Sequence, residues 1–532
     1  MMKRLNRKDL TLLGLITILF LVLNIMVINQ KVNLHVDEVY TYGLANHPYI
    51  DTFNMNPEQG RIYEPAEEAW DEYMQVPENH RFDYHNVWVN QQADVHPPLY
   101  YILVHTVCSF FPEEYSLWFA GSINIIFAIL TMITVFFLAL ELFNSKKAAF
   151  LTASAFVISA GILSAIGFMR MYIVSMFWTT LISWLMVRWK NKNRSYTFYF
   201  LLYLISVLGT LTHYYFLIWL FFLCLVWGVF LLIEKKYKDV LIFIGTMILS
   251  GITVLIIFPS ILNHILSGHR GVEAFSNLKN NSSTDYLERL NIFYNYLNDQ
   301  IFGGIFPILV GLLILSLVLM ALKKYIKIKK NRYPKNSIKN NVFLYKIILL
   351  IVPVLFYYTL VAKIAAYAYD RYIQLIYPVT LILACAMIFQ ISKGLFPKKA
   401  IFTGALVLIS IMSLSGLRLC EWEYLYRDSA NLLDKAKEHI GEKCIYIYDG
   451  LWKAQPSFYE IKNYQSVVFV AQNNLEFINS LSLNPEEEVV WCVMDTCEQE
   501  PIFTKIESIY GYDYTIEELG HYFFSTSYAI HS

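Results

Sequence analysis

Long apolar runs recur along most of the chain and give way to shorter, charged patterns after residue 417. A helix needs roughly 20 mostly apolar residues to cross a hydrocarbon core about 30 Å thick. Eleven runs approach or reach that length, and we predict a transmembrane helix in each. They lie at about 9–29, 117–143, 148–166, 172–189, 196–212, 214–233, 240–258, 301–322, 343–361, 372–390 and 400–417. The pattern therefore predicts an α-helical polytopic membrane protein.

The segment from 418 to 532 has a different pattern. Short β-like runs at 444–450, 465–472 and 486–495 alternate with helix-like stretches such as 431–439. We therefore expect two domains, a transmembrane domain over 1–417 and a small α/β domain over 418–532. The first carries a long polar loop at 30–116 that separates its first two spans.

The basic residues predict how the chain crosses the membrane. Lys and Arg precede the first span, which places the amino end in the cytoplasm. The segment 97–111 is apolar but only about 15 residues long, and it begins with two prolines, so we predict a re-entrant or surface helix. Five later basic stretches then also face the cytoplasm, and the C-terminal domain lies outside. These stretches are 146–147, 188–194, 235–238, 323–339 and 393–399.

Composition supports the membrane assignment and excludes several other classes. Hydrophobic residues make up 56% of the chain, more than a soluble protein of this size needs. The formal net charge is zero, so the whole-chain charge predicts no nucleic acid or other acidic partner. The seven cysteines have no zinc-type spacing, although Cys492 and Cys497 are close enough in sequence to form a disulfide outside the cell.

With this topology, the polar segments that could carry chemistry all lie on the external face. They are HVDEVYTYGLA at 35–45, DVHPPLYY at 94–101, FMRMY at 168–172, THYYF at 212–216 and KIAAYAYDRY at 363–372. Their shared side was not used to derive the topology. It therefore supports a single external active site.

HVDEVYTYGLA and DVHPPLYY, followed by an Arg-x-Tyr turn and a late Arg-Tyr pair before a span, resemble the GT-C glycosyltransferases of the family 39 type, which are related to protein O-mannosyltransferases. The resemblance covers about residues 1–417, and DVHPPLYY is its most specific part. It implies a GT-C-like fold and an inverting enzyme. Such an enzyme moves a hexosyl or pentosyl group from a polyprenyl-phosphate carrier to an envelope glycan, lipid or protein on the outer face.

The chain departs from the family pattern in two places. Many relatives have a Gln-Glu pair where this chain has Gly167 and Phe168, so a contact made by that acid is absent or supplied elsewhere. The loop 259–300 is also too short for the β-trefoil insert of eukaryotic protein mannosyltransferases, which weakens the case for a protein acceptor.

Three carboxylates are the candidate catalytic residues. Attack by an acceptor hydroxyl on an anomeric carbon needs a base, and Asp37 stands at the family's Asp-Glu position. Glu38 points elsewhere on a helix or a strand, so we expect it to orient Asp37 or a neighbouring cation. Asp94 is expected to help the acceptor or to hold a cation; its alternative role is a helix cap.

Cations and aromatic residues near the same surface are the candidate substrate-binding groups. Negative charge gathers on the lipid phosphate as the glycosidic bond breaks, so cations should lie where that charge develops. Arg170 and Arg371 fit this need, although Arg170 could instead extend from an apolar segment to the membrane surface. The remaining candidates are His96, Tyr172, His213, Lys363 and Tyr372.

Two other functions stay open. A transporter of lipid-linked oligosaccharides would carry polar residues through the membrane and show two related halves, whereas the polar groups here cluster at one face. A noncatalytic scaffold that displays the C-terminal domain would not need Asp37 or Asp94. No cofactor is identified, although the three carboxylates could hold a divalent cation. The Lys, Ile and Asn content favours a bacterial plasma membrane.

Overall fold

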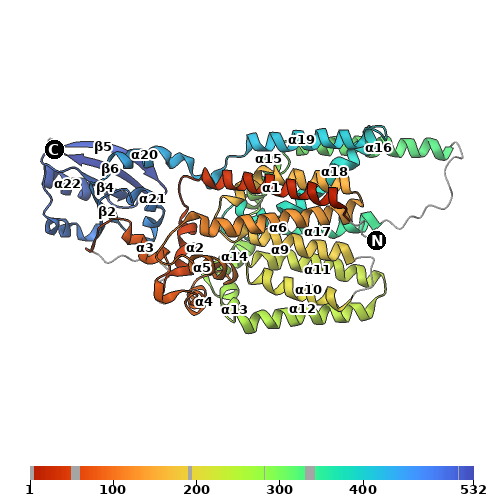
Figure 1. The fold of residues 1–532 in the computed structure, drawn as a ribbon, viewed down its shortest axis with the longest axis horizontal. Helices are drawn as coiled ribbons and strands as arrows, with labels where there is room; N and C mark the ends of the chain where they lie inside the picture. The colour runs from red at the N-terminus through yellow and green to blue at the C-terminus, as the bar shows by residue number, and fades with distance from the viewer. Residues whose placement is uncertain are drawn as a thin grey trace.

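The computed structural model describes residues 5–48, 60–189, 195–280, 282–329, 342–512 and 514–531. A helical bundle runs along the long axis of the molecule, and a domain built on a β-sheet lies beyond one end of it (Figure 1). The amino and carboxyl termini lie at opposite ends. Parts of two predicted basic stretches, 190–194 and 330–339, lie outside the described residues.

All eleven predicted spans are helical. Their helices are α1 (Arg7–Asn29), α6 (Leu117–Phe143), α7 (Lys146–Val157), α8 (Ala160–Ile166), α9 (Tyr172–Trp189), α10 (Tyr196–Thr210), α11 (Tyr215–Ile233), α12 (Tyr237–Ile257), α16 (Phe306–Lys329), α17 (Val342–Ile364), α18 (Tyr377–Leu395) and α19 (Ile401–Leu419). Within the described residues, eight helices are long and apolar enough to cross a membrane, or nine if the pair α7 and α8, bent by 51°, is one span. The count of eleven requires α9 and α10 to cross as well, and α10 has only 15 residues.

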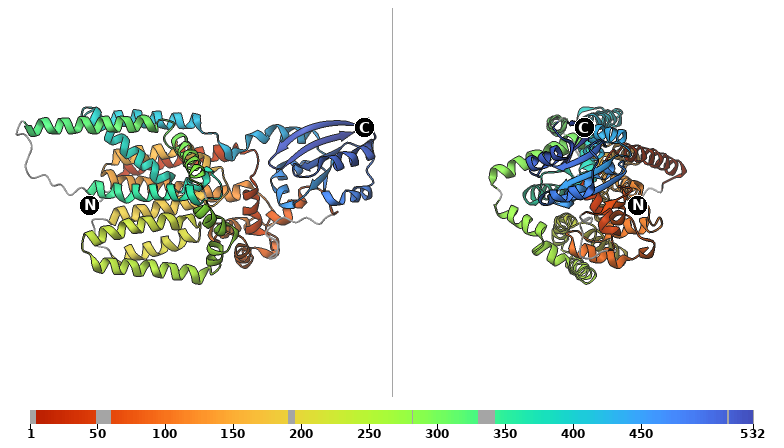
Figure 2. Two further views of the ribbon diagram at one scale, coloured as in Figure 1. Left: turned by 180° about the vertical axis from the view of Figure 1, so that it is seen from behind. Right: turned by 90° about the vertical axis from the view of Figure 1, so that its left-hand side faces the viewer.

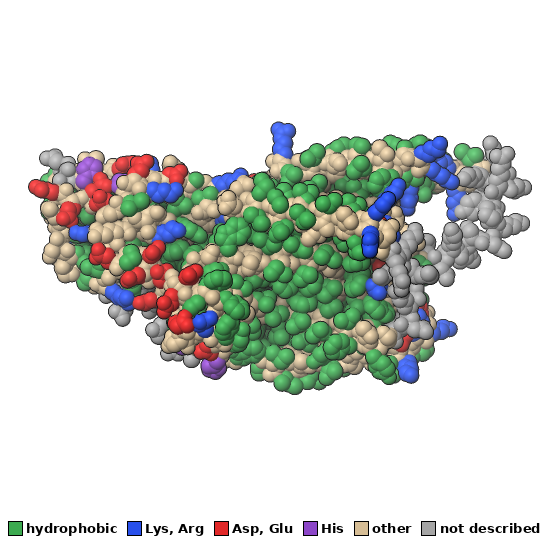
Figure 3. Space-filling model, viewed as in Figure 1, with side chains coloured by type: hydrophobic (Ala, Val, Ile, Leu, Met, Phe, Trp, Pro, Cys, Tyr) green, Lys and Arg blue, Asp and Glu red, His purple; other side chains and the backbone are tan. Residues whose placement is uncertain are grey.

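Burial sorts the helices into inner and outer ones. The apolar window of α18 is 83% buried and that of α6 is 61% buried, whereas α16 and α12 are only 11% and 22% buried. A helix that is apolar all round suits either a protein interior or a lipid environment. The outer surface of the bundle is accordingly covered with hydrophobic side chains (Figure 3).

Short helices occupy the space between the bundle and the sheet domain (Figures 1 and 2). They are α2 (Val36–Asn46), α3 (Glu68–Met74), α4 (Tyr84–Ala93), α5 (Leu99–Cys108), α13 (Ile261–Leu266) and α14 (His269–Asn280). The longer helix α15 (Ser283–Gln300) packs against α17 and α19 of the bundle. The doubtful segment 97–111 contains α5, whose ten residues extend about 15 Å at 1.5 Å per residue. It is therefore too short to cross, as predicted.

The C-terminal domain is a six-stranded sheet with the order β1-β3-β2-β4-β6-β5. The strands are β1 (Ile62–Tyr63), β2 (Lys443–Tyr448), β3 (Ser466–Ala471), β4 (Val489–Met494), β5 (Thr515–Tyr522) and β6 (Ser525–His531). The three predicted β-like runs are thus confirmed as β2, β3 and β4, which pair in parallel. Helices α20 (Ala430–Glu438), α21 (Phe458–Ile461) and α22 (Gln499–Tyr510) complete the domain.

Strand β1 comes from the 30–116 loop rather than from the C-terminal segment. Ile62 pairs with Val468 in an antiparallel register. The 30–116 loop and the C-terminal segment therefore share one sheet.

All seven cysteines are free. The Sγ of Cys492 lies 3.7 Å from that of Cys444, and Cys497 contacts the carbonyl oxygen of Ile447 instead. The two cysteines considered for a disulfide therefore face different partners.

Candidate active site

The segment HVDEVYTYGLA forms helix α2, and its first residue caps the helix. The backbone N–H of Asp37 donates to Nδ1 of His35 at 3.0 Å, and the backbone N–H of His35 donates to Oε2 of Glu38 at 2.8 Å. Such a capping box satisfies N–H groups that have no partner within the helix, and carboxylates in the first turn also interact favourably with the helix dipole. The local sequence thus places two acids side by side at the start of α2.

Glu38 points away from solvent and ties three segments together. Its carboxylate, with no exposed surface, accepts from Lys31 Nζ at 2.9 Å and from the backbone N–H of Met169 at 2.7 Å. Burial disfavours the charged form of both groups. It raises the pKa of Glu38, although Lys31 opposes this, and it lowers the pKa of Lys31, although Glu38 opposes that. Glu38 therefore has the contacts of an orienting group and does not face the cavity described below.

Asp37 faces the opposite way, towards an arginine from a distant part of the chain. Arg371 lies in the short helix η2 (Asp370–Tyr372), and its Nη1 donates to Oδ2 of Asp37 at 2.8 Å. Burial acts to raise the pKa of Asp37, but the charge of Arg371, with smaller contributions from His35 and Arg170, outweighs it and lowers the pKa below its ordinary value. Asp37 is thus a carboxylate paired to a guanidinium.

Arg170 is held inside the protein and does not reach to a membrane surface. Only 3% of its surface is exposed. Its Nη1 donates to the carbonyl oxygen of Asp37, to Thr41 Oγ1 and to the hydroxyl of Tyr101, at 3.1, 3.2 and 2.9 Å. Among the described residues, neither its Nε nor that of Arg371 has a hydrogen-bond partner. Two buried guanidinium groups therefore keep spare donors beside Asp37.

The segment DVHPPLYY supplies a second chain of contacts to Arg170. Nδ1 of His96 lies 2.7 Å from Oδ2 of Asp94, and Nε2 of His96 lies 3.3 Å from Nη2 of Arg170. Because the guanidinium donates to Nε2, the ring proton belongs on Nδ1, where it is donated to Asp94. Asp94 ends helix α4 and does not cap α5, so the structure does not support the alternative role of N-terminal cap. Burial acts to raise the pKa of Asp94, but His96 and then Arg170 lower it.

His213 lies just before helix α11 and contacts the backbone of its first residue. Its Nδ1 accepts the backbone N–H of Tyr215 at 3.0 Å. Burial, with smaller contributions from His96 and Arg170, lowers its pKa to about 3. The ring is therefore neutral and carries its proton on Nε2.

Several of these groups line a cavity of about 390 Å³. Its polar wall is made by Asp37, His96, Arg170, Tyr172, His213, Arg270, Arg371 and Tyr372. Its other wall is apolar and comes from α11, α13, α14 and α17, through Leu217, Ile218, Ile265, Ala274, Phe275, Leu278, Leu360 and Ile364. A cavity lined by both charged and apolar side chains suits a ligand with a polar head and a hydrocarbon chain.

The structure thus brings seven of the ten predicted site residues to the cavity wall. Asp94 contacts His96 but is not in the cavity lining. Glu38 is also absent from the lining, because it contacts Lys31 and Met169 instead. Lys363 lies instead with its Nζ 5.3 Å from the ring of Tyr286, outside the cavity lining.

Sequence reasoning missed His35, Arg270 and the two residues that hold Arg170. Thr41 and Tyr101 belong to the two motif segments, so their positions were a usable signal. Arg270 lies on helix α14, in a segment without any motif, and its Nη1 pairs with Glu273 at 2.8 Å. Nothing in the sequence distinguishes it from other surface arginines.

Phe168 stands where the pattern that the sequence resembles has an acid. Its ring packs on Tyr424 at 4.4 Å, and the guanidinium of Arg371 lies over it at 5.9 Å. An aromatic face therefore supports Arg371 where the family pattern has a carboxylate.

The described residues contain no group of three or more His, Cys, Asp or Glu side chains that could hold a metal ion. At the candidate site, the carboxylate of Asp37 has a guanidinium as its partner, and that of Asp94 has an imidazole. The sequence left a divalent cation open, and both of these carboxylates have protein partners in the structure.

No family model and no curated protein sequence matches the chain. Among solved structures, ArnT from Cupriavidus metallidurans bound to undecaprenyl phosphate is similar with a TM-score of 0.53 and 10% identity, over 97% of each chain. The apo state of the same protein has a TM-score of 0.46 and 12% identity, over 93% of this chain and 96% of that one. The archaeal oligosaccharyltransferase AglB from Archaeoglobus fulgidus, in complex with an inhibitory peptide and a dolichol-phosphate, has a TM-score of 0.44 and 12% identity, over 92% and 69%. The likeness to the first structure shows that this multi-pass chain has the GT-C fold of membrane glycosyltransferases.

Proposed function

We propose that this protein is an inverting glycosyltransferase that moves a sugar from a polyprenyl-phosphate carrier to an acceptor on the outer face of the membrane. The observation that carries the proposal is the cavity wall where the Asp37 carboxylate pairs with buried Arg371 and the Asp37 carbonyl oxygen accepts from buried Arg170, beside many apolar side chains. A GT-C fold shared with a protein that binds undecaprenyl phosphate supports the same substrate class. The sugar is proposed only as a hexosyl or pentosyl group.

The cavity suggests how the donor would lie. The guanidinium groups of Arg170 and Arg371, which line the cavity, would donate to the phosphate oxygens, because guanidinium groups match phosphate geometry. The neutral His213 would offer its Nε2 proton to the phosphate or the sugar. The apolar wall would receive the first isoprenoid units, which fits the aliphatic side chains from α11 and α17.

The proposed reaction is a single displacement at the anomeric carbon. The acceptor oxygen forms a bond to that carbon while the bond to the phosphate oxygen breaks, and the bonding electrons leave with the phosphate. The acceptor proton passes to the carboxylate of Asp37. Arg170 and Arg371 stabilise the charge that develops on the leaving phosphate, and such preorganised donors are often the largest single contribution to catalysis.

Arg371 would also control the strength of the base. In the structure its charge holds the pKa of Asp37 down against the effect of burial, which makes the carboxylate a weak proton acceptor. A donor phosphate that accepts from Arg371 would neutralise part of that charge. The pKa of Asp37 would then rise, and proton transfer to it would become more favourable.

The proposed orientation places the sheet domain and the site outside the cytoplasm. Most acidic side chains in view lie over the sheet domain, and several Lys and Arg side chains cluster at the far end of the bundle (Figure 3). Cytoplasmic loops of membrane proteins are enriched in Lys and Arg. A bacterial plasma membrane, and an envelope glycan, lipid or protein as the acceptor, complete the proposal.

The test is release of the free carrier phosphate from a panel of polyprenyl-phosphate sugars by the purified protein. The Asp37→Asn variant should bind the donor but release the carrier at least a hundredfold more slowly, as general-base catalysis contributes about a hundredfold to ten-thousandfold. Asp434→Asn, the same change at an exposed position on α20, is the control and should behave as wild type. Equal release by wild type and Asp37→Asn would remove Asp37 as the base, and failure of wild type to bind or turn over any donor would overturn the proposed function.

A further inference from the structure

The turn between β5 and β6 of the C-terminal domain reaches the start of helix α2. The hydroxyl of Tyr522 donates to the carbonyl oxygen of Leu34 at 3.0 Å, in a fully buried contact. The next residue, Phe523, packs its ring edge-on against His35, with 5.0 Å between the ring centroids. The tip of the external domain therefore touches both the backbone and the side chain that precede Asp37.

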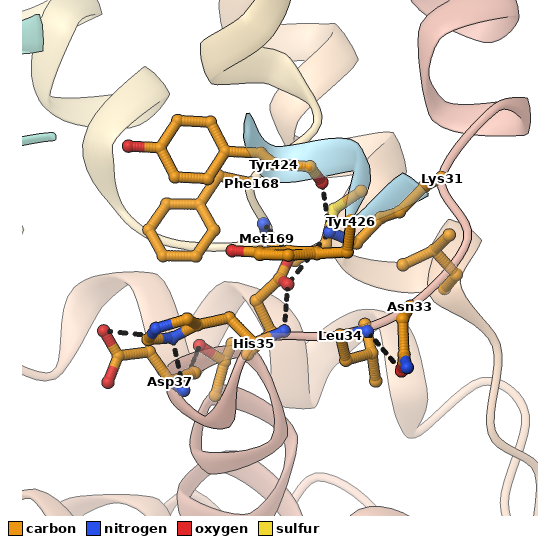
Figure 4. A network of polar contacts seen from close by, with 12 residues as sticks. Lys31, Asn33, Leu34, His35, Asp37, Phe168, Met169, Tyr424 and Tyr426 are labelled. Atoms are coloured by element: carbon orange, nitrogen blue, oxygen red, sulfur yellow. Dashed lines mark hydrogen bonds and ion pairs between the residues drawn. The ribbon is translucent and has the colours of Figure 1, made fainter. Parts of the chain in front are cut away.

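The ring of His35 is enclosed by aromatic residues from three separate parts of the chain. Besides Phe523, it contacts Tyr426 from the linker after α19, at 6.1 Å, and Phe168 from the turn before α9, at 5.8 Å. Figure 4 shows Tyr426 lying between His35 and Lys31, whose Nζ is 4.5 Å from the centre of the Tyr426 ring. Lys31 therefore contacts both Tyr426, which lies against His35, and Glu38.

Both aromatic residues that approach from the C-terminal segment have strained backbones. Phe523 and Tyr426 each have a φ of +50°, in the left-handed region that residues other than glycine rarely adopt. Strain of this kind persists only where the surrounding contacts hold it, and it is concentrated at functional sites. Here it directs both rings at His35.

We propose that the β5–β6 turn, through Tyr522 and Phe523, is a positioning element for Asp37, so that the C-terminal domain forms part of the active site. The inference rests on the proposed role of Asp37 as the base. Tyr522 holds the backbone at Leu34, and Phe523 holds the ring of His35, whose Nδ1 caps the N–H of Asp37 itself. An error of about 1 Å in the position of a catalytic group can reduce the rate about a hundredfold.

Burial among these rings also keeps His35 unprotonated, which is the form that can cap the N–H of Asp37. Nδ1 of His35 accepts a hydrogen bond only while it is unprotonated. Burial lowers the pKa of His35 to about 4. The negative charge of Asp37 opposes this lowering of the pKa. The positive charges of Arg371, Arg170 and Lys31 add to it, and Glu38 is nearby but paired with Lys31. The ring neighbours Tyr426 and Phe523 carry no charge at neutral pH, and Tyr522 acts through Leu34.

The test compares Phe523→Ala with Phe524→Ala. Both changes remove a half-buried phenyl ring from the same turn, but Phe524 packs on Trp452, with 5.4 Å between the rings, and no contact joins it to His35. Hydrogen exchange at the amides of residues 34–40 comes first, because this measurement needs no substrate. Phe523→Ala should speed exchange there at least tenfold, and Phe524→Ala should not. Unchanged exchange in Phe523→Ala would overturn the inference.

The second measurement uses whichever polyprenyl-phosphate sugar the wild type turns over. Phe523→Ala should lower kcat about tenfold to a hundredfold without changing KM for the donor. The acid limb of its pH profile should also move from about pH 4 up towards about 6.5, the ordinary pKa of histidine. Tyr522→Phe should lower kcat without moving the limb. A rise in KM alone, or an equal loss in Phe524→Ala, would overturn the inference. If the wild type turns over no donor, the proposed function fails, and the exchange measurement still decides whether the turn holds this segment.

Discussion

The buried ion pair between Lys31 and Glu38 predicts a strong and non-additive effect on stability. The Lys31 side chain is 1% exposed and that of Glu38 is fully buried, with 2.9 Å between Nζ and Oε2. Glu38→Gln removes the negative charge but keeps the shape of the side chain. It leaves the ammonium of Lys31 buried, with the carbonyl oxygen of Tyr424 and the ring of Tyr426 as its remaining partners.

Removing one partner of a buried ion pair costs about 3 to 5 kcal/mol, because the other charge stays buried and uncompensated. We expect Glu38→Gln to lower the free energy of unfolding by that amount. Lys31→Met should be near the lower limit, since the carboxylate keeps the N–H groups of His35 and Met169. The double variant buries no unpaired charge. It should therefore lose about 1 to 3 kcal/mol less than the sum of the two single losses.

The assay is denaturant unfolding of the purified protein in detergent, followed by tryptophan fluorescence. Glu517→Gln is the matched control, because Glu517 pairs with Lys435 at 3.1 Å on the surface, where such a pair contributes at most about 1 kcal/mol. Glu38→Gln within 1 kcal/mol of wild type, or strictly additive losses in the double variant, would refute the argument that this pair holds α1, α2 and the 167–171 turn together.

Three further predictions concern the cavity. Arg371→Lys should retain less than a tenth of the wild-type kcat and Arg371→Gln less still, because lysine cannot offer the paired donors of a guanidinium; full rescue by lysine would show that only the charge matters. The pKa of His213 in the folded protein, about 3, lies below its unfolded value of about 6.5, so the unfolded state binds more protons between these limits. Stability should therefore fall as the pH decreases from about 6.5 towards 3, and His213→Asn, which can still accept the N–H of Tyr215, should flatten that slope in denaturant titrations at several pH values. Carrier release should survive excess EDTA, because arginines supply the positive charge in the proposed mechanism; loss of activity that Mg²⁺ or Mn²⁺ restores would contradict this.

The arrangement of helices and strands was largely predictable from local pattern. A long apolar run has few stable alternatives to a helix in a membrane, so each of the eleven predicted spans is helical. The runs at 444–450, 465–472 and 486–495 are buried parallel strands, which read as nearly continuous hydrophobic stretches. The number of membrane-spanning helices was less predictable. Helices α9 and α10 were both predicted to cross, but neither meets the combined length and hydropathy expected of a spanning helix.

The chemistry of the site was predictable by residue type but not by partner. A carboxylate beside the membrane and two arginines near the same surface could be read from the motif segments. Nothing local could reveal that Asp37 pairs with Arg371, which is 334 positions away, or that Glu38 accepts from the backbone N–H of Met169. The expected contact of Lys363 with substrate has no support in the cavity lining, because an interfacial lysine carries no signal of which way it points.

The sequence by itself determined where this chain is helical, where it is extended and which segments carry acids and cations, because those features depend on residues close together along the chain. Only the tertiary structure decided that Asp37 meets the cavity while Glu38 is buried, and that a turn near residue 523 encloses His35. The reason is physical: burial and charge pairing depend on which distant segments pack together, and that choice is made by the whole fold at once.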